Sequence, residues 1–290
     1  MSPAQMPRII YYYQTHFYRG RHVSILPVLQ HDTGVTHIIV AAIHINHKDH
    51  PAGHISLNDD PYDDPKLDIV WREVHALQRN GIKVLGMLGG AAQGSFTKLD
   101  GDIEGFEHAY GPLRRMIQHT GLNGLDLDVE EAMSLGGIIR LIVRLKSDFG
   151  HDFLITLAPV RTAMVNKQNL SGFDHVTLEK GLGQFIAWYN TQFYCGWGDM
   201  SSTKGFDEIM GHGWPPEKIV VGLVTNPENC RGWVGDEQLR KALTALKKKY
   251  PKLGGVMGWE YFNSITESHP QEGEPWVWAK FIKTILYADD

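Results

Sequence analysis

The chain has 290 residues, a hydrophobic fraction of 42% and a formal net charge of -5, so it carries enough apolar material for a full core. Its basic residues form no dominant patch, which argues against a nucleic-acid partner. No apolar run reaches the roughly 18 residues of a membrane span, so we expect no membrane partner, and we expect a monomer.

Short apolar runs rich in Ile, Val, Leu and Tyr alternate with helical patterns along the chain. The predicted strands are residues 8–14, 36–46, 82–89, 124–130, 153–160, 186–194, 219–225 and 254–261. The predicted helices are residues 67–79, 136–149, 236–250, with Asp236 as the N-cap, and 276–287. Helical patterns are weaker after the second and fifth strands, where we expect irregular segments.

Eight alternating βα units imply a parallel sheet closed into a single (β/α)8 TIM barrel, in which irregular segments replace some helices. We therefore assign the fold to the α/β class and expect residues 1–290 to form one catalytic domain. Catalytic residues of such barrels lie at the carboxyl ends of the strands.

Three acids alternate with apolar residues on the predicted fourth strand. Asp126, Asp128 and Glu130 are two residues apart, so on a strand they share one face, about 6.7 Å apart at each step. Inside a barrel, three carboxyls cost several kcal/mol each unless they are paired or protonated. A purely structural role for these acids is therefore disfavoured.

Neighbouring carboxyls cannot all ionise cheaply, so they share protons and titrate as a group. Glu130 is last on the strand and nearest to the mouth of the barrel, and we expect it to be held protonated as a general acid. Asp128, one step below, can accept hydrogen bonds from a substrate or from Glu130. Asp126 lies deeper and is expected to tune Asp128.

Residues 122–130 resemble the signature of glycoside hydrolase family 18, in which a glycine and an apolar residue precede Asp-x-Asp-x-Glu. Asn123 stands where many members have Asp, and Met87 stands where the family often has Ser, so we assign no polar role to Met87. Within the family, the chain is most similar to endo-β-N-acetylglucosaminidases of filamentous fungi. The stretches that carry this resemblance are residues 89–96, 125–134, 153–160, 188–194 and 254–264.

The resemblance implies substrate-assisted catalysis without a metal or another cofactor. Glu130 would protonate the leaving oxygen while the carbonyl oxygen of the substrate's own 2-acetamido group attacks the anomeric carbon. Asp128 would hold the acetamido N–H and offset the positive charge of the oxazolinium intermediate. Tyr194 would donate its hydroxyl to the acetamido oxygen and fix the geometry of attack.

Other residues are expected to bind the sugar itself. By resemblance, Gln192 would contact the same sugar and Trp259 would form the apolar floor of its pocket, while Gly89 and Gly90 would make room with their backbone. Trp197, in the loop after the sixth strand, could stack on a sugar or simply pack. The predicted substrate-binding set is Gln192, Trp259, Gly89, Gly90, Trp197 and Asn190.

Four histidines follow the second strand at spacings that could suit a metal, namely His44, His47, His50 and His54. The family chemistry needs no metal, so we interpret this segment as a polar loop that contacts glycan.

Three functions compete. The leading one is a mannosyl-glycoprotein endo-β-N-acetylglucosaminidase that cuts the core of N-glycans or N-glycoproteins, and the second is a chitinase with the same mechanism. The third is a sugar-binding barrel without activity, against which the intact Glu130 argues. Polar loops after the first two strands favour a branched glycan through His16, Arg19, Arg21, His22, His44, Asn46, His47, Lys48 and Asp49.

The first residues and the cysteines bear on the compartment. Residues 1–5 lack a basic start followed by an apolar stretch, as a signal peptide would require. Cys195 and Cys230 do not make a disulfide framework. We therefore expect a cytoplasmic enzyme with two free thiols, and the alternative is a secreted enzyme whose leader has been removed.

Overall fold

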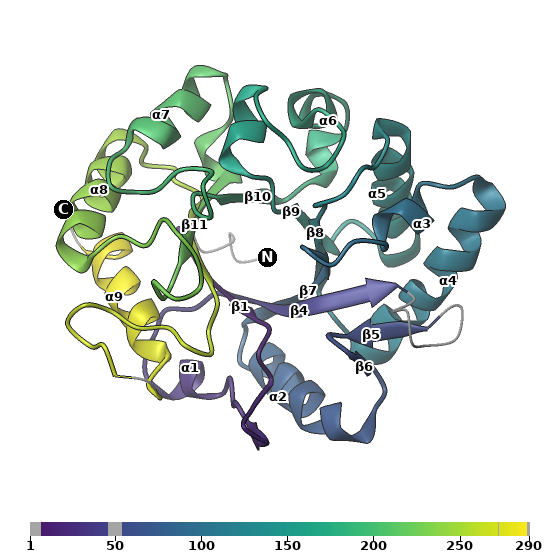
Figure 1. Ribbon diagram of the computed structural model, residues 1–290, viewed down its shortest axis with the longest axis horizontal. Coiled ribbons are helices and arrows are strands. Elements are labelled where there is room, and N and C mark those ends of the chain that lie inside the picture. The colour runs from purple at the N-terminus through teal and green to yellow at the C-terminus, as the bar shows by residue number, and fades with distance from the viewer. Residues whose placement is uncertain (1–6, 46–53, 272, 289–290) are drawn as a thin grey trace.

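Eight parallel strands close into a barrel in the computed structural model, which describes residues 7–45, 54–271 and 273–288 (Figure 1). The first of them, β1, pairs with both β4 and β12, and these two pairings close the sheet. The predicted barrel and its eight strands are confirmed. The strands are β1 (Arg8–Tyr13), β4 (His37–Ile45), β7 (Lys83–Gly89), β8 (Gly124–Asp128), β9 (Leu154–Leu157), β10 (Trp188–Gln192), β11 (Ile219–Val224) and β12 (Gly255–Trp259).

Helices surround the barrel on its outside (Figure 1). They are α1 (Pro27–Gln30), α2 (Asp68–Arg79), α3 (Phe96–Leu99), α4 (Ile103–Thr120), α5 (Leu135–Phe149), α6 (His175–Leu182), α7 (Lys204–Gly211), α8 (Asp236–Lys249) and α9 (Trp276–Leu286). Short 3-10 helices are η1 (Pro65–Leu67), η2 (Arg161–Val165), η3 (Gly183–Phe185) and η4 (Pro216–Lys218). The predicted helices correspond to α2, α5, α8 and α9.

The chain departs from a regular βα repeat in three places. After β4, the short strands β5 (Ile55–Leu57) and β6 (Asp60–Pro61) precede α2, and after β9 come only η2 and the eight-residue α6. Both segments were expected to be irregular. After β1, an unexpected hairpin of β2 (Phe17–Tyr18) and β3 (Arg21–His22) precedes the four-residue α1.

Two details of the helices differ from the sequence prediction. The 18-residue helix α4 was not predicted, although the side chain of Asp102 caps its start by accepting the N–H of Gly105 at 2.8 Å. Asp236 is the first residue of α8 and does not cap it. Its carboxylate instead accepts the backbone N–H groups of Glu267 and Ser268, at 3.0 Å each, because that loop presents its donors directly to this side chain.

Alternation along the strands divides the buried side chains into two layers. On β1, Tyr11 and Tyr13 belong to the core between barrel and helices, whereas Tyr12 belongs to the smaller cluster inside the barrel. On β8, Leu125 and Leu127 likewise pack toward the helices. The opposite face of β8 therefore carries its acids into the barrel.

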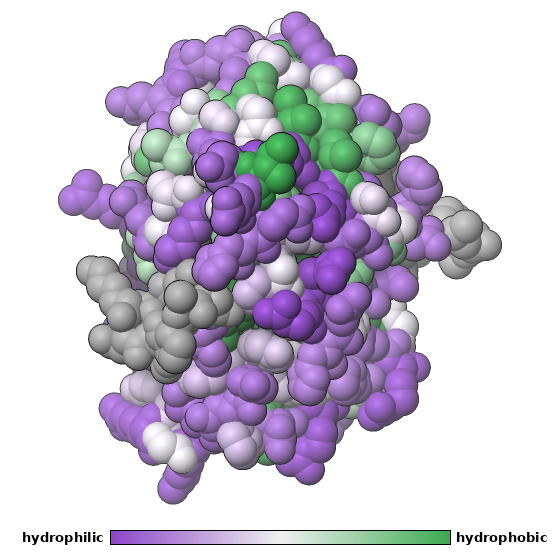
Figure 2. All heavy atoms as spheres, turned by 90° about the vertical axis from the view of Figure 1, so that its right-hand side faces the viewer, coloured by the Kyte–Doolittle hydropathy of each residue, from purple (hydrophilic) through white to green (hydrophobic). Residues whose placement is uncertain are grey.

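On the side of the barrel that carries α3, α4 and α5, the surface is largely hydrophilic, with one hydrophobic area in its upper half (Figure 2). Two helices of that side each carry an exposed large hydrophobic residue, Ile103 on α4 and Val143 on α5. Across the described part of the chain, no helix combines the length and apolarity that crossing a bilayer requires.

Candidate active site

A cavity of about 430 Å³ opens at the carboxyl ends of the barrel strands. Its wall is built from the ends of β1, β4, β7, β8, β10 and β12, from the loops that follow them, and from the segment after β9. The residues that line it are Gln14, Ala42, His44, Met87, Gly89, Gly90, Ala91, Ala92, Asp128, Glu130, Leu170, Gln192, Tyr194, Cys195, Trp197 and Trp259.

The three acids of the fourth barrel strand lie at increasing depth below this cavity. β8 ends at Asp128, so Glu130 lies just beyond the strand, where it is partly buried and lines the cavity. Asp128 is buried and also lines the cavity, whereas Asp126 is fully buried and does not reach it. The three acids, with Tyr12, Thr156, Asn190 and Gln192, are called the barrel cluster below.

Asp128 is a buried carboxyl of the barrel cluster that also lines the cavity. Burial raises its pKa well above the usual range, and negative charge on Glu130 and Asp126 raises it further. Gln192 donates from Nε2 toward Asp128 Oδ1 and Glu130 Oε1, at 3.3 Å each, and toward the carbonyl oxygen of Ala158 at 2.9 Å. The amide of Gln192 thus contacts both Asp128 and Glu130.

Asp126, the deepest acid of the barrel cluster, accepts three hydrogen bonds. Tyr12 donates its hydroxyl to Oδ2 at 2.6 Å, while Thr156 and Asn190 donate to Oδ1 at 2.5 and 3.0 Å. Burial raises the pKa of Asp126, and these hydrogen bonds oppose the rise. Asn190 also accepts the indole N–H of Trp188 at 2.9 Å, so the structure places it below the cavity and not on its wall.

Aromatic side chains also line the cavity. Burial raises the pKa of Tyr194 well above its usual value, and charge on Asp128, Glu130 and Asp126 raises it further. The hydroxyl therefore stays protonated and can donate to a ligand. Trp259 lines the cavity at the end of β12 and packs on Tyr12 with ring centroids 5.4 Å apart. Trp197 also lines the cavity.

Gly89 and Gly90 both lie on the cavity wall with positive φ angles of 93° and 90°. A Cβ at Gly89 would lie 2.4 Å from the ring of Phe96 and 2.5 Å from the carbonyl oxygen of Asp128. Gly89 is therefore required by close packing against β8. A Cβ at Gly90 would approach Met87 at 2.9 Å and Asp128 Oδ2 at 3.6 Å. The absence of a side chain at Gly90 therefore leaves the carboxyl of Asp128 accessible from the cavity.

The structure joins Cys195 and Cys230 in a disulfide, with Cα atoms 5.3 Å apart, so the prediction of two free thiols is wrong. The two cysteines are 35 residues apart in sequence, and their loops meet because they follow the paired strands β10 and β11. The N–H of Cys195 also donates to the carbonyl oxygen of Arg231 at 2.7 Å. The cross-link thereby fixes the loop that follows Tyr194.

Sequence reasoning missed two buried acids that hold the rim of the cavity. Glu131 accepts the backbone N–H groups of Gly94 and Phe96, at 2.9 and 2.7 Å, and so fixes the glycine-rich loop after β7. Glu260 accepts the N–H groups of Gln14 and Thr15, at 3.0 and 2.9 Å, and fixes the chain after β1. Glu131 directly follows Glu130, and Glu260 directly follows Trp259. This proximity to predicted site residues was the signal in the sequence that could have identified them.

The polar loops contribute less to the mouth than the sequence suggested. His16 is buried, and burial lowers its pKa to about 3, while His22 lies 3.2 Å from the carboxylate of Glu73. Neither histidine is on the cavity wall, whereas His44 is. Asn46, His47, Lys48, Asp49 and His50 lie outside the described residues.

Two solved structures are similar to this protein over nearly its whole length. The structure of a fungal endo-β-N-acetylglucosaminidase from glycosyl hydrolase family 18 matches with a TM-score of 0.91 and 46% sequence identity, covering 97% of this chain and 99% of that chain. A chitinase from Aspergillus fumigatus matches with a TM-score of 0.87 and 52% identity, covering 94% and 96%.

A curated relative agrees at a greater distance. Chitinase 1 of Rhizopus niveus is 27% identical over 206 residues, which is 66% of this chain. The match spans only 39% of the length of that relative. No protein-family model matches the sequence.

Proposed function

Because the chain belongs to glycoside hydrolase family 18, we propose that it is an endo-β-N-acetylglucosaminidase that cuts between the two N-acetylglucosamines at the base of an N-glycan. The chain would act as a single catalytic domain on a glycan or a glycoprotein. Support for the chemistry comes from Asp128, Glu130 and Tyr194, which face one cavity of about 430 Å³.

In the first step, Glu130 donates its proton to the leaving glycosidic oxygen. The carbonyl oxygen of the substrate's own 2-acetamido group attacks the anomeric carbon, and the bond to the leaving sugar breaks. General acid catalysis of this kind contributes about 10²–10⁴-fold to a rate. Glu130 is the acid of the barrel cluster that lies nearest to the mouth of the barrel, and its place on the cavity wall supports this role.

Asp128 and Tyr194 hold the acetamido group during this attack. Asp128 accepts its N–H, and the tyrosine hydroxyl donates to its carbonyl oxygen, which fixes the geometry of attack. Since burial and neighbouring charge raise the pKa of Asp128, its ionised form is costly in the empty site. The positive charge of the oxazolinium lowers that cost, so the carboxylate binds the intermediate better than the substrate.

In the second step, Glu130 accepts a proton from water, which attacks the anomeric carbon and opens the oxazolinium. Two displacements occur at that carbon, so the product keeps the β configuration. No metal or other cofactor takes part in this scheme. An NMR spectrum recorded early in the reaction tests it, because the α-anomer as first product would contradict the mechanism.

The compact cavity is the observation that carries the choice of substrate. Its aromatic lining residues in the described part of the chain are Tyr194, Trp197 and Trp259, which suits one acetamido sugar. A chitin chain of repeated flat sugars favours a groove longer than this cavity. The exposed residues Arg19 and Arg21, on the hairpin after β1, offer donors to the hydroxyls of a branched glycan.

The proposal is tested by the ratio of kcat/KM on an N-glycan to kcat/KM on a chitin oligomer, with products identified by mass. Glu130→Gln serves as the control for contaminating activity. A ratio that favours the chitin oligomer by tenfold or more, about 1.4 kcal/mol of transition-state preference, would overturn the assignment.

That outcome would support a chitinase, the second candidate. The 52% identity to the Aspergillus fumigatus chitinase favours it, because it exceeds the 46% identity to the fungal endo-β-N-acetylglucosaminidase. Both candidates use the same acids in the same mechanism.

The disulfide supports an oxidising compartment for this enzyme, since the cytosol of most cells keeps thiols reduced. We therefore favour secretion over the cytoplasmic location that the sequence first suggested. Detection of intact protein with the Cys195–Cys230 bond in the culture medium, and not in the cell extract, would support this location.

A further inference from the structure

A second cavity, of about 480 Å³, lies beside the catalytic one. It is bounded by the β2–β3 hairpin, the start of α1, the segment after β12 and the start of α9. Four of its ten lining residues are aromatic. The residues that line it are Tyr18, Val23, Ser24, Pro27, Tyr261, Phe262, Asn263, Gly273, Pro275 and Trp276.

An exposed pair of aromatic side chains marks this region. Phe17 and Tyr18 are 36% and 40% exposed, and they are neighbours at the tip of the hairpin. The ring of Tyr18 lies 4.5 Å from the ring of Phe262, with the planes tilted by 50°. Exposed aromatic rings in a concave site mark a place for a ligand, because a ring presents an apolar face beside polar groups. The apolar faces of pyranose rings match such a surface.

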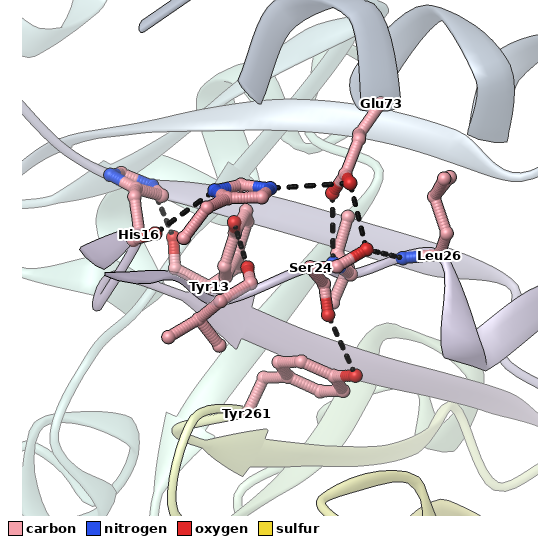
Figure 3. A network of polar contacts seen from close by, with 9 residues as sticks. Tyr13, His16, Ser24, Leu26, Glu73 and Tyr261 are labelled. Atoms are coloured by element: carbon pink, nitrogen blue, oxygen red, sulfur yellow. Dashed lines mark hydrogen bonds and ion pairs between the residues drawn. The ribbon is translucent and has the colours of Figure 1, made fainter. Parts of the chain in front are cut away.

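The hairpin is tied at its base to a polar network, called the hairpin cluster (Figure 3). The carboxylate of Glu73, on α2, accepts the hydroxyl of Ser24 at 2.7 Å and the N–H of Ile25 at 2.9 Å. The members of this cluster are Tyr13, His16, His22, Ser24, Glu73 and Tyr261. These contacts restrain the base of the hairpin, which lowers the entropy cost of binding at its tip.

The two cavities are neighbours along the segment that follows β12. Trp259 lines the catalytic cavity and Phe262 lines the second one, so their Cα atoms are at most about 11 Å apart. Glu260 lies between them and ties the segment to the chain after β1. Asn229 links them as well, donating to the carbonyl oxygen of Trp259 at 2.8 Å and accepting from Asn263 at 2.6 Å.

We propose that Tyr18, Phe262 and Trp276 form a second carbohydrate site, which binds a pyranose from an outlying arm of the same substrate. The inference rests on the proposed function, because a branched glycan can fill the catalytic cavity with its core and the second cavity with one arm. Stacking on Tyr18 and Phe262 supplies the contact, and Arg19, whose guanidinium lies 5.1 Å from the Tyr18 ring centre, can donate to sugar hydroxyls.

The test compares variants on two substrates of different size. One is a released high-mannose N-glycan, and the other is the same glycan trimmed to its two N-acetylglucosamines and one mannose. For Tyr18→Ala and Phe262→Ala we expect KM on the full glycan to rise about tenfold, equivalent to about 1.4 kcal/mol, with kcat unchanged. On the trimmed glycan neither parameter should change.

Two further variants guard against a loss of structure. Phe17→Ala removes an equally exposed ring from the same hairpin that does not line the cavity, so its KM should match the parent on both glycans. Tyr18→Trp keeps an aromatic face and should restore most of the affinity for the full glycan. An equal loss on both glycans, or no loss on either, would overturn the second site.

The second site can be tested even if the proposed N-glycan specificity is wrong. If the enzyme prefers chitin oligomers, the same variants are measured on a long and a short oligomer, and a loss confined to the long one supports the site while the proposed function fails. A loss that appears with a glycoprotein but not with its released glycan would overturn the proposal, since the cavity would then contact protein.

Discussion

Tyr12 and Tyr13 are neighbours on β1, yet they belong to two buried clusters that work in different ways. The hydroxyl of Tyr12 points into the barrel cluster and donates to Asp126 at 2.6 Å. The hydroxyl of Tyr13 points to the hairpin cluster and donates to the carbonyl oxygen of Val23 at 2.5 Å. The alternation of side chains on a strand thus sends adjacent residues to opposite sides of the sheet.

The difference between the clusters lies in how their carboxyls are satisfied. Glu73 is the carboxylate of the hairpin cluster, and backbone and hydroxyl donors fill its two oxygens. The barrel cluster places three acids in series, and Asp128 has its pKa raised by burial and by its acidic neighbours. A buried acid with enough donors fixes the chain, whereas an acid held beside other acids is prepared to exchange protons.

The largest expected effect comes from Glu130→Gln in the barrel cluster. The amide keeps the shape of the side chain but cannot donate a proton at the strength of the acid, so kcat should fall by about 10²–10⁴-fold. Glycan affinity and melting temperature should stay near the parental values. Steady-state kinetics and calorimetry check both, and a near-parental kcat would remove Glu130 from the mechanism.

Asp128→Asn should lower activity but raise stability at neutral pH. Hydrolysis should fall by about 10²-fold, because the amide cannot offset positive charge. Since the pKa of Asp128 is raised in the folded state, the parent loses stability as pH rises from about 3.9 through that raised value, by about 1.4 kcal/mol for each unit. The variant escapes this loss.

The variant should therefore exceed the parent in free energy of unfolding at neutral pH, and the gap should close below the ordinary pKa of Asp. Urea unfolding across this pH range measures the gap. A variant less stable than the parent at pH 7 would mean that Asp128 is a satisfied structural acid.

Glu73→Gln, in the hairpin cluster, should lower stability and leave the pH dependence of activity unchanged. The amide presents N–H to one of the two donors that now face the carboxylate, so the free energy of unfolding should fall by about 1–3 kcal/mol. The pH profile of kcat should not move, because no titrating group of the barrel cluster is changed. A shifted profile would show that the two clusters are coupled.

Tyr12→Phe and Tyr13→Phe form the smallest and most closely matched comparison. Each removes one hydroxyl and should lower the free energy of unfolding by about 1 kcal/mol. Loss of the hydrogen bond from Tyr12 also raises the pKa of Asp126, so the acidic limb of the pH profile should move to higher pH. Tyr13→Phe should lower the free energy of unfolding without moving the pH profile of activity. Equal pH profiles for the two variants would contradict the separation of the barrel cluster from the hairpin cluster.

Much of this arrangement follows from local patterns in the sequence. The alternation of Asp126 and Asp128 with Leu125 and Leu127 defines an inward acidic face on β8, and the apolar runs locate all eight barrel strands. Periodicity needs uninterrupted segments, however. Gly111 and Pro112 obscured α4, although Phe106, Ala109, Leu113 and Met116 follow helical spacing and are buried.

Features that depend on neighbours distant in sequence were not predictable in the same way. Glu73 lies on the apolar face of α2, next to Val74, and an acid on that face was a usable signal of a buried partner. Nothing in the sequence identified Ser24 as its donor. The cavity lined by Tyr18 and Phe262 joins segments separated by most of the chain, so only the closed barrel reveals it.

The Cys195–Cys230 disulfide has a practical consequence for anyone who prepares this enzyme. A bacterial cytosol keeps thiols reduced, so a preparation made there would begin without the cross-link between the loops after β10 and β11. A buffer with dithiothreitol would reduce the disulfide in a preparation that carries it. Because the loop concerned carries Cys195 and Trp197 of the cavity wall, the redox state of each preparation should be fixed before specificities are compared.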